Sequence, residues 1–261
     1  MEPIKYTTMY KLAGQYHCDD SPIMVEAGAL LKNEKTNRLM IQLKMKNIGA
    51  KEISACRVWF QIKDSFGSEI ETIAEHSYID LHAKSGESFG SSIPVYVSKE
   101  EARTFEMAVI EIAFVNGEKW DGERKAWPMI PSPKSIDVYY EDQQLAKQFE
   151  IEVGESNRYV PEVRGSLFFC CCGDVRLVNI DKCAVCGRSK KELLSIVSDS
   201  EGLRLRAEER LKLEAEERKE KERLEEEQRQ KKEQNKERQE KNGRVKKRRK
   251  SRRIRKRRLS L

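Results

Sequence analysis

Five of the seven cysteines of this chain lie within residues 170–186. Four of them form two closely spaced pairs, Cys170-x-Cys172 and Cys183-x-x-Cys186, and a glycine follows each pair. Two thiolate pairs on two tight turns are a donor set that suits tetrahedral Zn²⁺, and the glycines permit the positive φ that such turns need. The spacing therefore predicts one zinc ion held by Cys170, Cys172, Cys183 and Cys186.

The first cysteine pair departs from the C-x-x-C spacing that is common in zinc ribbons, which leaves open whether Cys171 replaces Cys170 or Cys172 as a ligand. Four thiolates close the coordination sphere and leave no position for a catalytic water, so a structural ion is expected. A redox role for Cys183-x-x-Cys186 is the competing interpretation, but no strand–helix–strand pattern surrounds the pair. Because no nucleophile–base pair or phosphate loop is visible, we expect a protein that is not an enzyme and takes no small-molecule substrate.

Period-two alternation of apolar residues recurs through residues 20–122, for example over 39–45 and 56–62, and a first domain is assigned to residues 1–122. A weaker strand is expected over 70–81 and another strand over 89–97, where Pro94 places it at a sheet edge. Asn116-Gly117 has the composition of a hairpin turn. Six or seven short strands with turn signals between them predict an antiparallel β-sandwich of the immunoglobulin or fibronectin type.

The stretches SFGSSIPVYV and FEMAVIEIAFVNGEKW, taken with the cysteine motif, resemble uncharacterised bacterial zinc-ribbon proteins that carry an N-terminal β-sandwich domain. The resemblance implies this fold and a binding role for the sandwich toward a protein partner, but no chemistry. In similar proteins a charged helix and a basic cluster precede a transmembrane segment. This sequence has no such apolar segment, so the resemblance leads to the hypothesis that it is a shortened or soluble form of a membrane-anchored protein.

The middle of the chain is divided by composition. Residues 123–167 are expected to be a linker, because three prolines between Trp127 and Pro133 make a stiff connector, and a short amphipathic helix is predicted over 140–153. The zinc ribbon is assigned to residues 168–188. A charged helix is assigned to residues 189–242.

Residues 203–241 contain no proline or glycine and are mostly strong helix formers. Pairs of Glu with a basic residue four positions later recur, such as Glu208–Lys212 and Glu227–Lys231, and each contributes about 0.2–0.5 kcal/mol. The leucines do not keep a heptad, which favours a single charged helix over a coiled coil. Asn242-Gly243 is expected to end the helix.

Charge is concentrated at the C-terminus. Residues 244–261 contain 12 basic and no acidic side chains, whereas the whole chain has a net charge of +7. This contrast predicts an anionic partner for the tail alone, and self-repulsion predicts that residues 243–261 are disordered. The residues expected to bind the anionic surface are Lys246, Lys247, Arg248, Arg249, Lys250, Arg252, Arg253, Arg255, Lys256, Arg257 and Arg258.

Three partners fit such a tail: nucleic acid through its phosphates, an anionic membrane surface, and a receptor that reads a localisation address. The sequence has no apolar stretch of signal-peptide or membrane-spanning length. The expectation is therefore a cytoplasmic protein without a transmembrane segment, with the inner face of the membrane as one site of attachment. Its function is expected to be that of a modular scaffold, and the alternative is a nucleic-acid-binding protein that uses ribbon and tail together.

Overall fold

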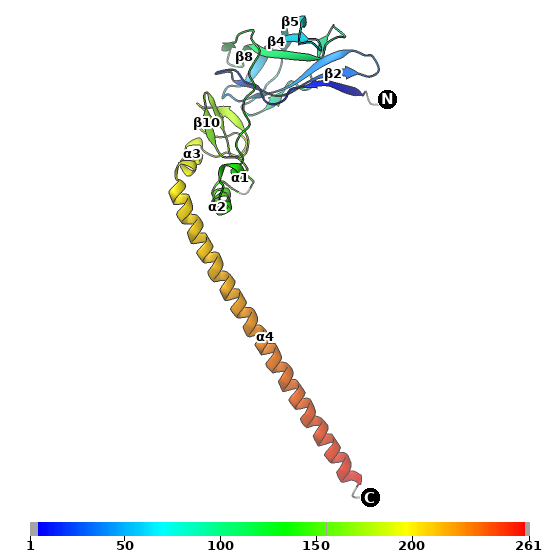
Figure 1. Cartoon of the computed structure of the whole chain (residues 1–261), viewed down its shortest axis with the longest axis vertical. Helices are drawn as coiled ribbons and strands as arrows, with labels where there is room; N and C mark the ends of the chain where they lie inside the picture. The colour runs from blue at the N-terminus through cyan, green and yellow to red at the C-terminus, as the bar shows by residue number, and fades with distance from the viewer. Residues whose placement is uncertain (1–4, 155, 259–261) are drawn as a thin grey trace. The chain divides into compact units, whose positions relative to one another are not determined.

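The computed structural model describes residues 5–154 and 156–258, with side chains described up to Gln234. Residues Met1–Leu203 form one compact unit, and Arg204–Leu261 form a second. The first unit contains three antiparallel sheets and three helices, and the second consists of most of a long helix (Figure 1). The mainly β character and the long C-terminal helix agree with the sequence prediction.

Two antiparallel sheets account for residues 6–121. The first sheet consists of β1 (Tyr6–Lys11), β2 (Ile23–Asn33), β3 (Leu39–Asn47), β6 (Ser88–Phe89) and β7 (Val95–Val97), and both short strands pair with β3. The second sheet has the order β5 (Glu69–Tyr78), β4 (Ile53–Lys63), β8 (Thr104–Phe114) and β9 (Lys119–Asp121).

The two sheets share one hydrophobic core. Ile41 on β3 and Phe60 on β4 are fully buried in it, and the ring of Phe60 meets that of Phe105 edge-on with centroids 6.2 Å apart. Fully burying such a side chain contributes about 1.5–3 kcal/mol. The alternation predicted over 39–45 and 56–62 is thus confirmed as the inward-facing side of two strands.

The structure corrects two details of the strand prediction. Strand β1 was not predicted, because it lies at a sheet edge and its mostly exposed side chains show no clear alternation. The strand expected over 89–97 is two short strands, β6 and β7, which pair with opposite ends of β3. Pro94 lies between them, where a residue without a backbone N–H removes no sheet hydrogen bond.

The proline-rich segment is packed against the large sheets rather than extended as a connector. Trp127 is buried, and its backbone N–H donates to Met107 O at 3.0 Å. The N–H of Ile130 donates to Gln15 O at 2.8 Å. Two helices follow, α1 (Ile136–Tyr139) and α2 (Gln143–Val153), so the helix predicted from residue 140 starts later than expected.

A small antiparallel sheet comes next, formed by β10 (Glu162–Arg164), β11 (Leu167–Phe169) and β12 (Val175–Leu177). This small sheet starts before residue 168, where the sequence placed the boundary of the ribbon. The reason is a tight hairpin at Gly165, whose φ of 57° returns the chain so that β10 pairs with β11.

Two helices complete the chain, α3 (Lys190–Ser198) and α4 (Ser200–Arg258). Helix α4 continues through Asn242 and Gly243, where the sequence predicted its end and a disordered tail. One interior glycine costs only about 1 kcal/mol relative to alanine, and no proline follows to stop the helix. The side chains of the predicted anion-binding residues, Lys246 to Arg258, lie outside the described residues.

Ion pairs between neighbouring turns lie along the exposed surface of α4. Lys231 Nζ is 3.8 Å from Glu227 Oε2, as the sequence predicted. Glu208 instead pairs with Arg204 at 3.5 Å, rather than with Lys212. Within the described part of the chain, no helix combines the length and the apolar character needed to cross a membrane.

The shared core makes a direct prediction about stability. Phe60→Ala is expected to lower the free energy of unfolding by about 3–5 kcal/mol, because it leaves a cavity between the two sheets. Phe66→Ala is the matched control, since Phe66 is 93% exposed in the β4–β5 turn. Urea denaturation of both variants measures the difference, and equal losses would contradict this assignment of the core.

Candidate metal centre

The first cysteine pair lies at the tip of the hairpin formed by β11 and β12. Cys170 directly follows β11, and its backbone N–H donates to Asp174 O at 2.8 Å. The N–H of Gly173 donates to Cys170 O at 2.9 Å, and Gly173 has a φ of 88°. A residue with a Cβ is strained at this φ, so the glycine permits the turn that presents Cys170 and Cys172.

The second cysteine pair lies on a loop that precedes α3 and has the same construction. The N–H of Gly187 donates to Cys183 O at 3.0 Å, and its φ is 71°. The backbone N–H of Val185 points at the sulfur of Cys183, at 3.4 Å. The positive φ values predicted after both pairs are therefore confirmed, and one backbone amide supports a ligand sulfur.

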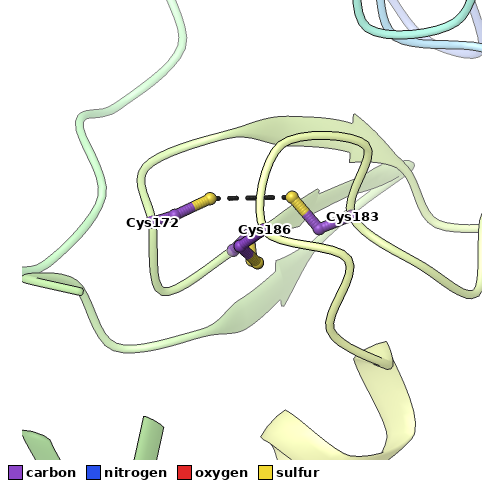
Figure 2. Close-up of side chains that lie close together, drawn as sticks. Cys172, Cys183 and Cys186 are labelled. Carbon is purple, nitrogen blue, oxygen red and sulfur yellow. Dashed lines mark hydrogen bonds between the residues drawn. The ribbon is translucent and has the colours of Figure 1, made fainter. Parts of the chain in front are cut away.

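These two turns bring the four predicted cysteines together, and Figure 2 shows three of them, Cys172, Cys183 and Cys186. We call Cys170, Cys172, Cys183 and Cys186 the four-cysteine group. Its sulfurs all lie within 4.8 Å of one another. Two of these separations join the turns: Cys170 to Cys186 at 3.5 Å and Cys172 to Cys183 at 3.6 Å. Four sulfurs at about 2.3 Å from a tetrahedral ion would be about 3.8 Å apart, so the group is able to hold one metal ion.

The extra cysteine of the first turn is not part of this group. Cys171 is fully buried, and its sulfur lies 3.9 Å from that of Cys170. Its sulfur is not within 4.8 Å of all the other four sulfurs, which is the separation that defines the group. The alternative that Cys171 replaces Cys170 or Cys172 is therefore not the arrangement that the fold adopts.

The surroundings of the group do not match a dithiol redox site. The small sheet that carries it is antiparallel, whereas a thioredoxin-like pair is expected beside a strand–helix–strand unit. Sulfur contacts also join the two turns, Cys183 to Cys172 at 3.6 Å and Cys186 to Cys170 at 3.5 Å.

Cys183 has hydrogen-bonding neighbours both inside and outside the group. Hydrogen bonds from the thiols of Cys170 and Cys172 lower the pKa of Cys183. The carboxyl group of Asp174 lies 3.2 Å from the same sulfur. Burial raises the pKa of Asp174, and the hydrogen bond from Lys46 acts in the opposite direction. Lys46, on β3, therefore reaches the surroundings of the four-cysteine group from the first sheet.

The contact between the small sheet and the first sheet is extensive, and sequence reasoning missed it. Met24 and Ile48 pack with residues of the small sheet, among them Phe169, in a separate apolar cluster. Arg176, on β12, is 1% exposed, and its guanidinium donates to the backbone oxygens of Asn47 at 3.4 Å and Gly49 at 3.3 Å. The only sequence signal was the position of Arg176 between apolar neighbours on β12.

No known family model, curated protein or solved structure matches this chain. The resemblance to bacterial zinc-ribbon proteins therefore rests on the cysteine motif and the sheets alone. These features define the class: a mainly antiparallel β protein with a largely buried group of four cysteines on a small sheet, followed by a long charged helix.

Two single substitutions test which cysteines of the first turn are needed to bind the metal ion. Cys172→Ala removes one of the four donors and is expected to lower the bound metal well below one ion per chain. Cys171→Ala removes the adjacent thiol, which lies outside the group, and is expected to retain the ion. Mass spectrometry of metal content, on protein purified under reducing conditions, measures both. Wild-type protein without metal, or equal loss in the two variants, would contradict the assignment.

Proposed function

We propose that this chain is a non-enzymatic modular scaffold. In this proposal the two large sheets form an immunoglobulin- or fibronectin-like sandwich that binds a protein partner. The four-cysteine group holds one structural Zn²⁺ in a zinc ribbon, α4 acts as a spacer, and the basic residues at the C-terminus attach the protein to an anionic surface. The closed donor set of the four-cysteine group is the observation that carries the proposal, because it supports structure rather than chemistry.

Zinc is the ion that this donor set supports best. Four cysteine sulfurs at tetrahedral spacing are soft donors, which favour Zn²⁺ over Mg²⁺ or Ca²⁺. The small sheet has three strands of three residues each, which is too little to form a large core. Metal binding would therefore supply much of the free energy that orders this region.

The composition and exposure of α4 support the role of spacer. Residues 208–234 are exposed almost throughout and carry charges of both signs, so the helix has little apolar surface to bury against a partner. Leu211, Leu213 and Leu224 are all at least 38% exposed and do not follow a heptad. We therefore favour a single helix over a coiled coil. At 1.5 Å per residue, residues 203–241 extend over about 58 Å.

The charge of the last residues supports attachment to an anionic surface. Eleven of the thirteen residues in 246–258 are basic, and each contributes about 1 kcal/mol near an anionic lipid surface. Attachment at the inner face of a membrane would place the protein in the cytoplasm, where reducing conditions favour metal binding over disulfides for clustered cysteines.

Nucleic acid is the second candidate partner, and the same basic run favours it. In this alternative the ribbon and the tail bind together. The ribbon offers little to a phosphate backbone, because Arg176 is buried against the first sheet and the exposed Asp181 and Lys182 balance each other. Because only the tail, and not the ribbon, offers a basic surface, we prefer the scaffold to the nucleic-acid-binding alternative.

Replacement of the eleven basic residues of 246–258 by glutamine is expected to weaken binding to phosphatidylserine-rich vesicles by at least about 100-fold. The control is a deletion of residues 219–231, a segment of α4 that has the same length but no net charge. It should bind like the full chain. Vesicle co-sedimentation at physiological salt measures all three proteins.

The same three proteins are titrated with duplex DNA and RNA. Tight binding of the glutamine variant to nucleic acid at physiological salt would contradict the scaffold and support the alternative. Failure of the full chain to bind vesicles would contradict membrane attachment, and a steep salt dependence on DNA would then assign the tail to phosphates.

A further inference from the structure

A buried ion pair links the first sheet to the four-cysteine group. Lys46 lies on the face of β3 that points away from the shared core, beside its register partner Met24 on β2. Its side chain is only 11% exposed and forms an ion pair with Asp174, whose side chain is 1% exposed. The other carboxylate oxygen of Asp174 lies 3.2 Å from the sulfur of Cys183. The order of contacts is thus Lys46, Asp174, Cys183.

The position of Lys46 is fixed by the contact between the two sheets. Arg176 donates to the backbone oxygens of Asn47 and Gly49, just after Lys46 on the chain. The N–H of Leu177 donates to Ile48 O at 3.1 Å, which adds a direct backbone link. Lys46 is therefore held where its ammonium meets Asp174.

The second cysteine turn itself rests on the first unit's large sheets. Gly86, in the loop before β6, approaches so closely that a Cβ built on it would lie 2.7 Å from Ala184 Cβ. Ala184 stands between Cys183 and Cys186. Because the contact leaves no room for a methyl group, this loop limits how far the second cysteine turn can move.

We propose that Lys46 is a positioning and charge-compensating residue of the metal centre, so that the first sheet sets the metal affinity of the small sheet. The inference rests on the proposed metal site. One divalent ion with four thiolates carries two net negative charges. The buried carboxylate of Asp174 adds a third next to Cys183, and like charges at this distance in a buried site repel strongly. Lys46 is the cation in direct contact with that carboxylate.

The dependence is reciprocal. If the contact with the first sheet raises the affinity for the ion, then the bound ion must strengthen the contact by the same factor. Such outer groups typically change metal affinity by about 10–100-fold. The metal centre would then work as a clamp between the small sheet and the first sheet.

The test compares Zn²⁺ affinities of the full chain by competition with a chromophoric chelator. Lys46→Gln is expected to weaken binding by about tenfold, because it leaves Asp174 uncompensated. Lys44→Gln is the matched control on the same strand, since Lys44 and Lys46 both contact Glu26 but only Lys46 pairs with Asp174. It should bind like the wild type.

A second comparison separates charge from packing. Asp174→Asn removes the repulsive carboxylate and is expected to bind Zn²⁺ at least as tightly as the wild type. Lys46→Gln combined with Asp174→Asn should return close to the wild-type affinity. If Lys46 only held the two sheets together, Asp174→Asn would break the same pair and weaken binding as well. Circular dichroism confirms that each variant is folded.

Amide hydrogen exchange supplies a readout on the first sheet. Removal of the ion with a chelator is expected to raise exchange in residues 84–88, where Gly86 approaches the second cysteine turn, but not at the β8–β9 turn, Asn116-Gly117. Unchanged affinity in Lys46→Gln, weaker binding in Asp174→Asn, or unchanged exchange in residues 84–88 would overturn the inference. A wild-type chain that binds no Zn²⁺ would overturn the metal centre itself.

Discussion

The burial of Arg176 between the small sheet and the end of β3 is the interaction on which the arrangement of the first unit depends. A guanidinium that is 1% exposed must find acceptors, because an unsatisfied buried charge is costly. Here its two terminal nitrogens donate to the oxygens of Asn47 and Gly49 and to the hydroxyl of Ser85, whereas its Nε has no hydrogen-bond partner among the described residues. These three acceptors lie on two segments of the chain that precede Arg176 by more than ninety residues in sequence, so Arg176 ties the small sheet to both segments.

This constraint explains why so short a sheet is ordered beside the larger ones. The small sheet shares its apolar cluster with Met24 and Ile48 and does not close a core of its own. Its four cysteines add a second constraint from the other side, because both cysteine turns must meet at one point. The small sheet is thus constrained both by packing against the first sheet and by the four-cysteine group. Asp174 contacts both sides, since it pairs with Lys46 and lies beside the sulfur of Cys183.

Helix α4 follows a different principle. Its described residues from Glu208 onward bury almost nothing, and its stability depends on local ion pairs and helix propensity. Such a helix keeps its own conformation without a partner surface. The same lack of apolar surface that makes it unsuited to a core fits the spacer role that we propose for it.

The sequence by itself determined the features that depend on local pattern. Alternation predicted most strands of the large sheets, the Cys-Gly turns predicted the membership of the four-cysteine group, and the run of charged helix formers predicted α4. Only the tertiary structure decided which polar residues are buried. Lys44 and Lys46 lie on the same face of β3, yet the small sheet covers Lys46 and leaves Lys44 exposed. That difference comes from contacts between residues more than 120 positions apart, and periodicity carries no information about such contacts.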